Sequence, residues 1–209
     1  MLNSQNWINN WNQTFHQIEK IKGEIESFVV EKSATEEEIK LIEQQLGYPL
    51  PISFREVLVK FSKQVELRWS FPDELSIPVE FDAIFAGELC WNLDSIEDLT
   101  EVADSLLKDV GDNYGENLRQ KLAFYTVPNG DYLALDLNSN NEDAAVVYWD
   151  HEEDSVTYVA DNFIEFIEKF TDLHLIGAEI WQWETFIDSK GINTDSEIAQ
   201  KWKKLFAEL

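Results

Sequence analysis

Residues 122–137 read LAFYTVPNGDYLALDL, two apolar runs on either side of Asn129-Gly130. Asn-Gly is the strongest short-range signal for a turn between two antiparallel strands, because both residues tolerate the positive φ that such a turn requires. Two more strand-like runs follow at 145–149 and 155–160, with turn-forming residues before each. We therefore expect residues 122–160 to form a four-stranded antiparallel meander.

Two short helices are expected before this sheet. Thr35 and Glu38 form a capping box at the start of the first helix, and Gly47 ends it. Pro51 fits the first turn of the second helix, where the Ser-x-x-Glu pattern at 53–56 repeats the capping signal. The two helices should meet at a tight corner.

The remaining segments give a mixture of strands and helices. Apolar residues three or four apart over 8–28 predict one N-terminal helix, which Gly23 weakens near its end. The other expected elements are a strand at 65–71, an acidic loop or short helix at 73–87, a strand at 89–93, a helix at 94–108 capped by Asp94 or Ser95, a loop at 111–115, a helix after Asp161 or Asn162, and two amphipathic helices around 180–187 and 198–209.

This order of elements predicts an α+β fold with a mostly antiparallel sheet of about five to six strands packed with helices. No repeat or linker divides the chain. We expect an N-terminal helical extension at 1–33, a central domain at 34–171 and a C-terminal helical extension at 172–209 that packs on the same domain.

The charge of the chain is concentrated in its middle. The protein has 41 acidic and 16 basic residues, a net charge of −25, and residues 73–168 carry −21 of it with 24 acids against Lys108, Arg119 and Lys121. Aromatic residues make up 13% of the chain, so a folded acidic surface is expected instead of a disordered tail. Such a surface repels nucleic acid and anionic membranes and attracts a basic protein. A generally solvated surface is the alternative, which the uneven distribution disfavours.

Cysteine usage and hydropathy indicate the compartment. Cys90 is the single cysteine, which excludes an intrachain disulfide and a cysteine-based zinc cluster, and a core thiol is expected. The N-terminal residues lack a signal-peptide pattern, and no apolar run approaches the roughly 18 residues of a membrane span. We expect a cytoplasmic protein.

Two stretches imitate metal sites. Residues 136–140 resemble the start of a calcium-binding EF-hand loop, but Asn141 stands where that loop needs glycine and Val147 where it needs glutamate. His151-Glu-Glu-Asp154 has no second histidine at helical spacing. Polar turns explain both stretches better, so no metal is expected.

Catalytic motifs are also missing from the sequence. His16, His151 and His174 lie in different regions, without a nucleophile motif or a phosphate-binding loop. A pair of catalytic carboxylates stays open as an enzymatic alternative, although 41 acids make any one pair uninformative. We expect no catalytic residues and no cofactor.

Trp69 and Trp91 lie in expected strands on either side of the most acidic loop. They are either core residues or aromatic anchors of a binding surface, in which case nearby carboxylates would contact Lys or Arg of a partner. The partner-binding residues predicted on the second interpretation are Trp69, Asp73, Glu74, Asp82, Glu88, Trp91 and Asp94.

Four stretches between residues 34 and 170 resemble the SUKH superfamily, which includes the Smi/Knr cell-wall-assembly regulators of yeast and many bacterial toxin-immunity proteins. They are ATEEEIKLIEQQLGYPLP at 34–51, WNLDS at 91–95, NGDYLALD at 129–136, and VVYWDH at 146–151 leading into ADNFIEF at 160–166. The chain departs from the resemblance at Lys63-Gln64, where many members have Asn-Gly, and in its terminal helices.

The resemblance implies a SUKH-like fold and a non-enzymatic role, with nuclease or deaminase toxins as typical partners. Together with the charge, it favours an immunity protein that binds and neutralises a basic, nuclease-type toxin. The alternative is a regulator or scaffold of cell-wall synthesis that binds endogenous proteins. The oligomeric state stays open.

Overall fold

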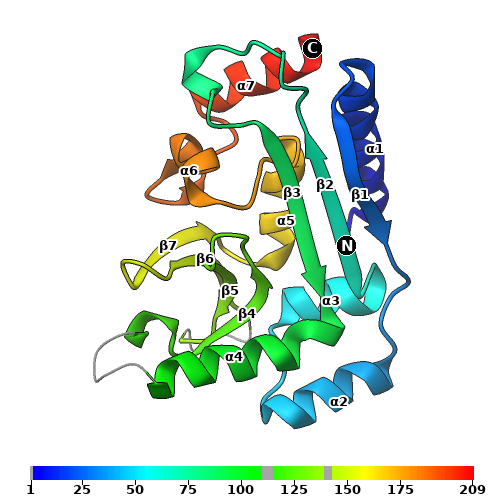
Figure 1. Ribbon diagram of the computed structural model, residues 1–209. Helices are drawn as coiled ribbons and strands as arrows, with labels where there is room; N and C mark the ends of the chain where they lie inside the picture. The colour runs from blue at the N-terminus through cyan, green and yellow to red at the C-terminus, as the bar shows by residue number, and fades with distance from the viewer. Residues whose placement is uncertain (1, 110–114, 139–142) are drawn as a thin grey trace. The chain divides into compact units, whose positions relative to one another are not determined.

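The computed structural model describes residues 2–109, 115–138 and 143–209 (Figure 1). The expected loop at 111–115 lies outside the described residues except for Gly115, as does most of the EF-hand-like stretch after Asn138. The chain divides into two compact units: the first contains residues 1–30, 65–90 and 167–209, and the second contains 31–64 and 91–166. Both ends of the chain share one unit with residues 65–90.

The described residues confirm the α+β fold. The helices are α1 (Ser4–Lys20), α2 (Glu36–Leu46), α3 (Ile52–Lys60), α4 (Ile96–Asp109), α5 (Phe163–Asp172), α6 (Ile180–Trp183) and α7 (Glu197–Glu208). The strands are β1 (Glu24–Val30), β2 (Gln64–Ser70), β3 (Ala86–Asn92), β4 (Lys121–Thr126), β5 (Tyr132–Asp136), β6 (Ala145–Asp150), β7 (Ser155–Ala160), β8 (Ile187–Asp188) and β9 (Gly191–Ile192). They form sheets in the orders β1-β2-β3, β4-β5-β6-β7 and β8-β9, which is more strands than expected.

The meander predicted from residues 122–160 is present in the second unit. Strands β4 to β7 pair with their neighbours in sequence order, all antiparallel. Asn129-Gly130 lies in the connection between β4 and β5, which spans 127–131 instead of two residues. The Val127 N–H donates to Asp131 O at 2.8 Å and closes this longer turn. Helix α4 lies along β4 (Figure 1).

The predicted capping box at α2 is also confirmed. The Glu38 N–H donates to Thr35 Oγ1 at 3.2 Å, the Thr35 N–H donates to the Glu38 carboxylate at 2.7 Å, and Gly47 ends the helix. The second capping prediction is wrong. Helix α3 begins at Ile52, so Ser53 already lies inside its first turn and cannot cap it.

Ser53 instead connects α3 to two distant parts of the second unit. Its hydroxyl donates to Asp143 Oδ1 at 2.7 Å, and its backbone N–H donates to the same oxygen at 3.1 Å. The Phe163 N–H, at the start of α5, donates to Ser53 Oγ at 3.0 Å. Asn162 caps α5, as expected, because its side chain accepts from Glu165 N at 3.0 Å.

The N-terminal helix is shorter than the apolar spacing predicted. Helix α1 ends at Lys20, and residues 24–30 form β1, which pairs antiparallel with β2. Gly23 turns the chain where a Cβ atom would lie 2.5 Å from Ser70 O. A β-bulge at Glu26 then puts Ile25 opposite Trp69 and Phe28 opposite Leu67 on one face of the sheet. A spacing of three residues in a bulged strand therefore imitated helical periodicity.

The C-terminal segment is only partly as expected. Helix α7 is confirmed, whereas α6 is a single turn and Ile187 belongs to β8. In the first unit, three buried indole groups from α1, β2 and α7 donate hydrogen bonds to the end of α5. The pairs are Trp11 Nε1 to Thr171 Oγ1 at 2.8 Å, Trp202 Nε1 to Leu173 O at 2.9 Å, and Trp69 Nε1 to His174 O at 3.1 Å.

His174 is held inside the first unit in its neutral form. Its ring stacks on Phe206 with centroids 4.0 Å apart, and its Nδ1 lies 3.1 Å from Thr14 Oγ1. Burial lowers the pKa of His174 from 6.5 to about 4, and the nearby Asp172 carboxylate only partly opposes this effect. The histidine is therefore neutral at pH 7.

Replacing His174 by Asn is expected to flatten the dependence of stability on pH. The folded pKa is about 4 and the unfolded value is 6.5, so acidification from pH 7 to pH 4.5 protonates mainly the unfolded chain and lowers the free energy of unfolding by roughly 2–3 kcal/mol. His174→Asn lacks this loss and tolerates the φ of +61° at this position. Urea unfolding of both proteins at the two pH values measures the difference. The same acid-induced loss in both proteins would contradict the assignment.

Ser53→Ala is expected to lower the free energy of unfolding by about 1–3 kcal/mol, because it leaves the Phe163 N–H and the Asp143 carboxylate without the hydroxyl. Ser189→Ala, at an exposed position, serves as the control and should change it by less than about 0.5 kcal/mol. Chemical denaturation measures both. Equal values for the two variants would show that the Ser53 hydroxyl has no stabilising role.

Candidate functional site

The two tryptophans predicted as candidate anchors are core residues. Trp69 is 0% and Trp91 is 1% exposed. The Trp91 Nε1 donates to Ser62 O at 3.2 Å, and its ring packs edge-on against Phe163. Of the two interpretations open for this pair, the structure therefore supports the core one, and neither indole can contact a partner.

Two of the predicted carboxylates are paired inside their own units. In the first unit, Glu88 lies 2.5 Å from Arg68 Nε, and only 12% of its side chain is exposed. In the second unit, Asp94 lies 3.2 Å from Lys63 Nζ. These contacts stabilise the fold, which makes Glu88 and Asp94 weaker candidates for partner binding than unpaired acids.

Lys63 has a structural role at the position where the chain departs from the family pattern. Its ammonium group lies 3.0 Å from Glu38 Oε1 as well as 3.2 Å from Asp94. The Thr35 N–H, and then Lys63, lower the pKa of Glu38 to about 2. The lysine therefore links the N-terminus of α2 to the segment after β3 in the second unit.

The other three predicted carboxylates lie on one loop of the first unit. Asp73, Glu74 and Asp82 are exposed, and none of them forms an ion pair with a described residue. They belong to residues 72–85, here called the acidic loop, whose ends are joined where the Phe71 N–H donates to Phe85 O at 2.8 Å. The acidic loop connects β2 to β3 in Figure 1.

The acidic loop is closed and internally bonded, as in a compact Ω-loop. The Leu75 N–H donates to Pro72 O and the Phe81 N–H to Pro78 O, both at 2.9 Å. Phe81 is buried, with its ring centroid 5.4 Å from that of Trp202. These contacts fix the loop on α7, so its carboxylates are held on a defined surface.

Sequence reasoning missed the exposed apolar residues of this surface. Val79 is 80%, Phe85 54% and Trp181 38% exposed, and the Phe85 and Trp181 rings lie 5.7 Å apart. The sequence does contain an indication that Phe85 and Trp181 are exposed. Adjacent Ile84 and Phe85 cannot both face inward from a short loop, and Trp181 and Trp183, two residues apart in a helix, point in different directions.

The second unit contains a buried polar cluster around Asp131. Its carboxylate accepts hydrogen bonds from the Tyr148 hydroxyl, from Asn129 Nδ2 at 2.6 Å and from His151 N at 2.9 Å, and lies 2.6 Å from His151 Nδ1. Burial alone would raise the pKa of Asp131, but these hydrogen bonds lower it overall. The cluster ties the 127–131 turn to the end of β6.

Residues His151–Asp154 form the polar turn that the sequence predicts, and both end residues of the turn hold neighbouring segments. The Asp154 carboxylate accepts from Trp149 Nε1 at 2.8 Å and from Gly115 N at 3.0 Å. Across 2–109, 115–138 and 143–209, no group of three or more potential metal ligands is found. Cys90 is buried, which raises the pKa of its thiol, as expected for a core cysteine.

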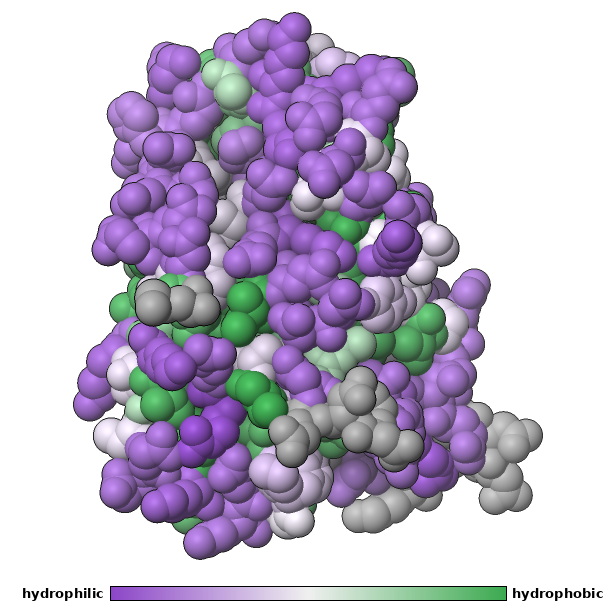
Figure 2. Space-filling model, turned by 180° about the vertical axis from the view of Figure 1, so that it is seen from behind, coloured by the Kyte–Doolittle hydropathy of each residue, from purple (hydrophilic) through white to green (hydrophobic). Residues whose placement is uncertain are grey.

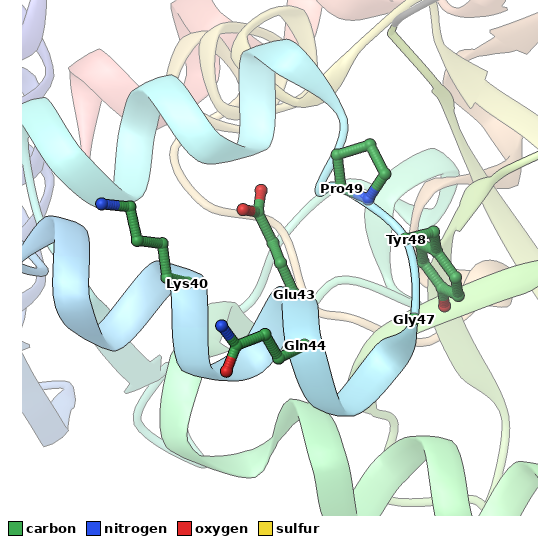
Figure 3. A pocket seen from close by; sticks show the side chains of 6 residues that line it. All are labelled: Lys40, Glu43, Gln44, Gly47, Tyr48 and Pro49. Atoms are coloured by element: carbon green, nitrogen blue, oxygen red, sulfur yellow. The ribbon is translucent and has the colours of Figure 1, made fainter.

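A pocket of about 360 Å³ lies at the corner between α2 and α3 (Figure 3). Lys40, Glu43 and Gln44 line it from α2, together with residues 47–49. Glu43 points toward α3, accepts from Leu50 N just before that helix at 3.0 Å, and lies 3.6 Å from Arg55 Nε within it. The pocket is thus built around the helix corner, where Glu43 holds the connection between the two helices.

Polar side chains cover most of the face in Figure 2, with small separate hydrophobic patches between them. No described helix is both long and apolar enough to cross a bilayer.

Comparison with known proteins agrees with the resemblance found in the sequence. No curated protein matches the chain. The sequence model of the SMI1/KNR4 family (SUKH-1) matches residues 33–169, about two-thirds of the chain. The match begins just before α2, includes the whole β4–β7 meander and ends within α5. The chain belongs to the SMI1/KNR4 family, SUKH-1.

Proposed function

We propose that this protein is a cytoplasmic immunity protein that binds a basic, nuclease-type protein toxin and blocks the surface with which the toxin holds nucleic acid. The observation that carries the proposal is the net charge of −21 over residues 73–168, together with the fixed and exposed carboxylates of the acidic loop. Membership of the SUKH-1 family supports it in general terms.

The electrostatic argument concerns how fast the two proteins meet. Long-range attraction between a carboxylate-rich surface and a basic protein raises the association rate constant by orders of magnitude at low salt. A nuclease needs Lys and Arg to neutralise the phosphates of its substrate. An acidic protein can therefore compete for the same cationic side chains.

Binding explains the polar side chains of the second unit better than catalysis does. Asp131, Asp143 and Glu43 each accept hydrogen bonds from backbone or side-chain donors, and His151 contacts Asp131, so these groups hold turns and helix ends together. A hydrolase would need such groups to face a substrate. We therefore propose a non-enzymatic role.

Neutralising the acidic loop should slow association with the toxin. The variant Asp73→Asn, Glu74→Gln, Asp82→Asn should associate about tenfold more slowly at 50 mM salt and at nearly the same rate as the unmodified protein at 500 mM salt, because salt screens the attraction. Surface plasmon resonance or stopped-flow fluorescence with the purified toxin domain measures both rates.

A matched control removes the same charge outside the acidic segment. Glu24→Gln, Glu26→Gln and Glu197→Gln replace three exposed acids that lie before residue 73 or after residue 168. This control should retain most of the association rate. An equal loss in both variants would mean that total charge, not the acidic loop, governs encounter, and an on-rate insensitive to salt would contradict the steering argument.

Neutralisation by binding should be stoichiometric. Adding the protein to a fixed amount of toxin is expected to reduce nuclease activity in proportion, up to a fixed molar ratio, and a complex should co-elute in size-exclusion chromatography. Inactivation by amounts far below the toxin concentration would indicate turnover and contradict the non-enzymatic role. Selective binding to a cell-wall synthesis protein instead would indicate a regulator.

A further inference from the structure

Phe85 and Trp181 form an exposed aromatic pair in the first unit. They come from separate segments, the end of the acidic loop and α6, and their ring planes are inclined by only 31° with centroids 5.7 Å apart. The neighbouring residues of both segments are buried: Phe81 and Ile84 on the loop, Trp183 on α6. The pair is thus an outward-facing aromatic surface on a rigid base.

A carboxylate lies directly beside this pair. The Trp181 indole N–H donates to the Glu179 carboxylate, so the charge is held at the edge of the indole ring. Trp181 is 38% exposed and Glu179 is half-buried, so part of the indole ring and part of the glutamate side chain face solvent. An aromatic face next to a carboxylate is the arrangement that binds a planar cation.

The segments around Phe85 and Trp181 contain acidic residues and no basic ones. Residues 72–88 and 175–189 contain no Lys, Arg or His. Their acids are Asp73, Glu74, Glu80, Asp82, Glu88, Glu179, Glu184 and Asp188. A bridge between Gly87 and Ile176 joins the two segments, and all of these acids except the half-buried Glu88 and Glu179 are exposed. Charge complementarity therefore selects a cationic partner for the aromatic pair.

We infer that Phe85, Trp181 and Glu179 bind an arginine side chain on the surface of the basic partner. This inference rests on the proposed function and deepens it, because it names the partner group that the surface holds. A guanidinium group is planar, so it stacks on an indole while donating two hydrogen bonds to a neighbouring carboxylate. A lysine ammonium group has no planar face and keeps its hydration more strongly. The site should therefore prefer arginine to lysine.

The test follows the indole N–H signals of the full chain by NMR during titration with hexa-arginine or hexalysine. Each of the eight tryptophans carries one indole N–H, and the Trp181 signal is identified by its absence in Trp181→Phe. Hexa-arginine is expected to shift the Trp181 signal with an affinity roughly fivefold higher than that of hexalysine. The signals of the buried indoles should move much less.

Three variants separate the site from general attraction between opposite charges. Glu179→Gln and Phe85→Ser should each abolish most of the preference for arginine, whereas the control Leu41→Ser, which replaces an exposed leucine on α2, should keep it. Equal shifts with both peptides, or a preference that survives Glu179→Gln, would overturn the inference. Because the peptides replace the toxin, this outcome would leave the proposed function standing, and failure to bind a toxin would be recognised separately in the rate measurements.

Discussion

Three indole N–H groups that converge on residues 171–174 organise the first unit. They come from α1, β2 and α7: Trp11 donates to the Thr171 hydroxyl in the last turn of α5, and Trp202 and Trp69 donate to the carbonyl groups of Leu173 and His174 just after the helix. Tryptophan fills a core and donates a hydrogen bond at the same time, which few other side chains can do. The position of Trp69 also requires a glycine in β3, because a Cβ atom at Gly87 would lie 2.0 Å from Trp69 Nε1. Replacement of this glycine would displace the indole that holds β2 against α5.

This core also determines which side chains face outward. With Phe81 packed near Trp202, the acidic loop exposes its carboxylates and Phe85. With Trp183 buried, Trp181 on the same turn points to solvent. Glu88, by contrast, faces Arg68 and contributes to the sheet. The packing of Phe81 and Trp183 in the core therefore leaves Phe85, Trp181 and the loop carboxylates exposed on the candidate binding surface.

Local signals in the sequence were sufficient for much of the fold. The capping box at Thr35 and the meander around Asn129-Gly130 depend on neighbouring residues, and both are confirmed. The N-terminal helix was overextended because the bulge at Glu26 places Ile25 and Phe28 on one face of a strand. Ser53 was misread as a cap because its partner Asp143 is 90 residues away. Glu88 and Asp94 of the candidate site are paired with Arg68 and Lys63, which lie 20 and 31 residues away along the chain. The spacing of residues in the sequence does not indicate such pairs.

The closure of the acidic loop has a consequence for how this protein can diversify. One backbone hydrogen bond joins its ends and Phe81 anchors its interior, so the residues between Asp73 and Glu80 contribute little to the sheet. The exposed side chains of this segment can therefore be replaced with little effect on the sheet. Substitutions there can change the exposed side chains of this surface while the hydrogen bond and the Phe81 contact that hold the loop are retained.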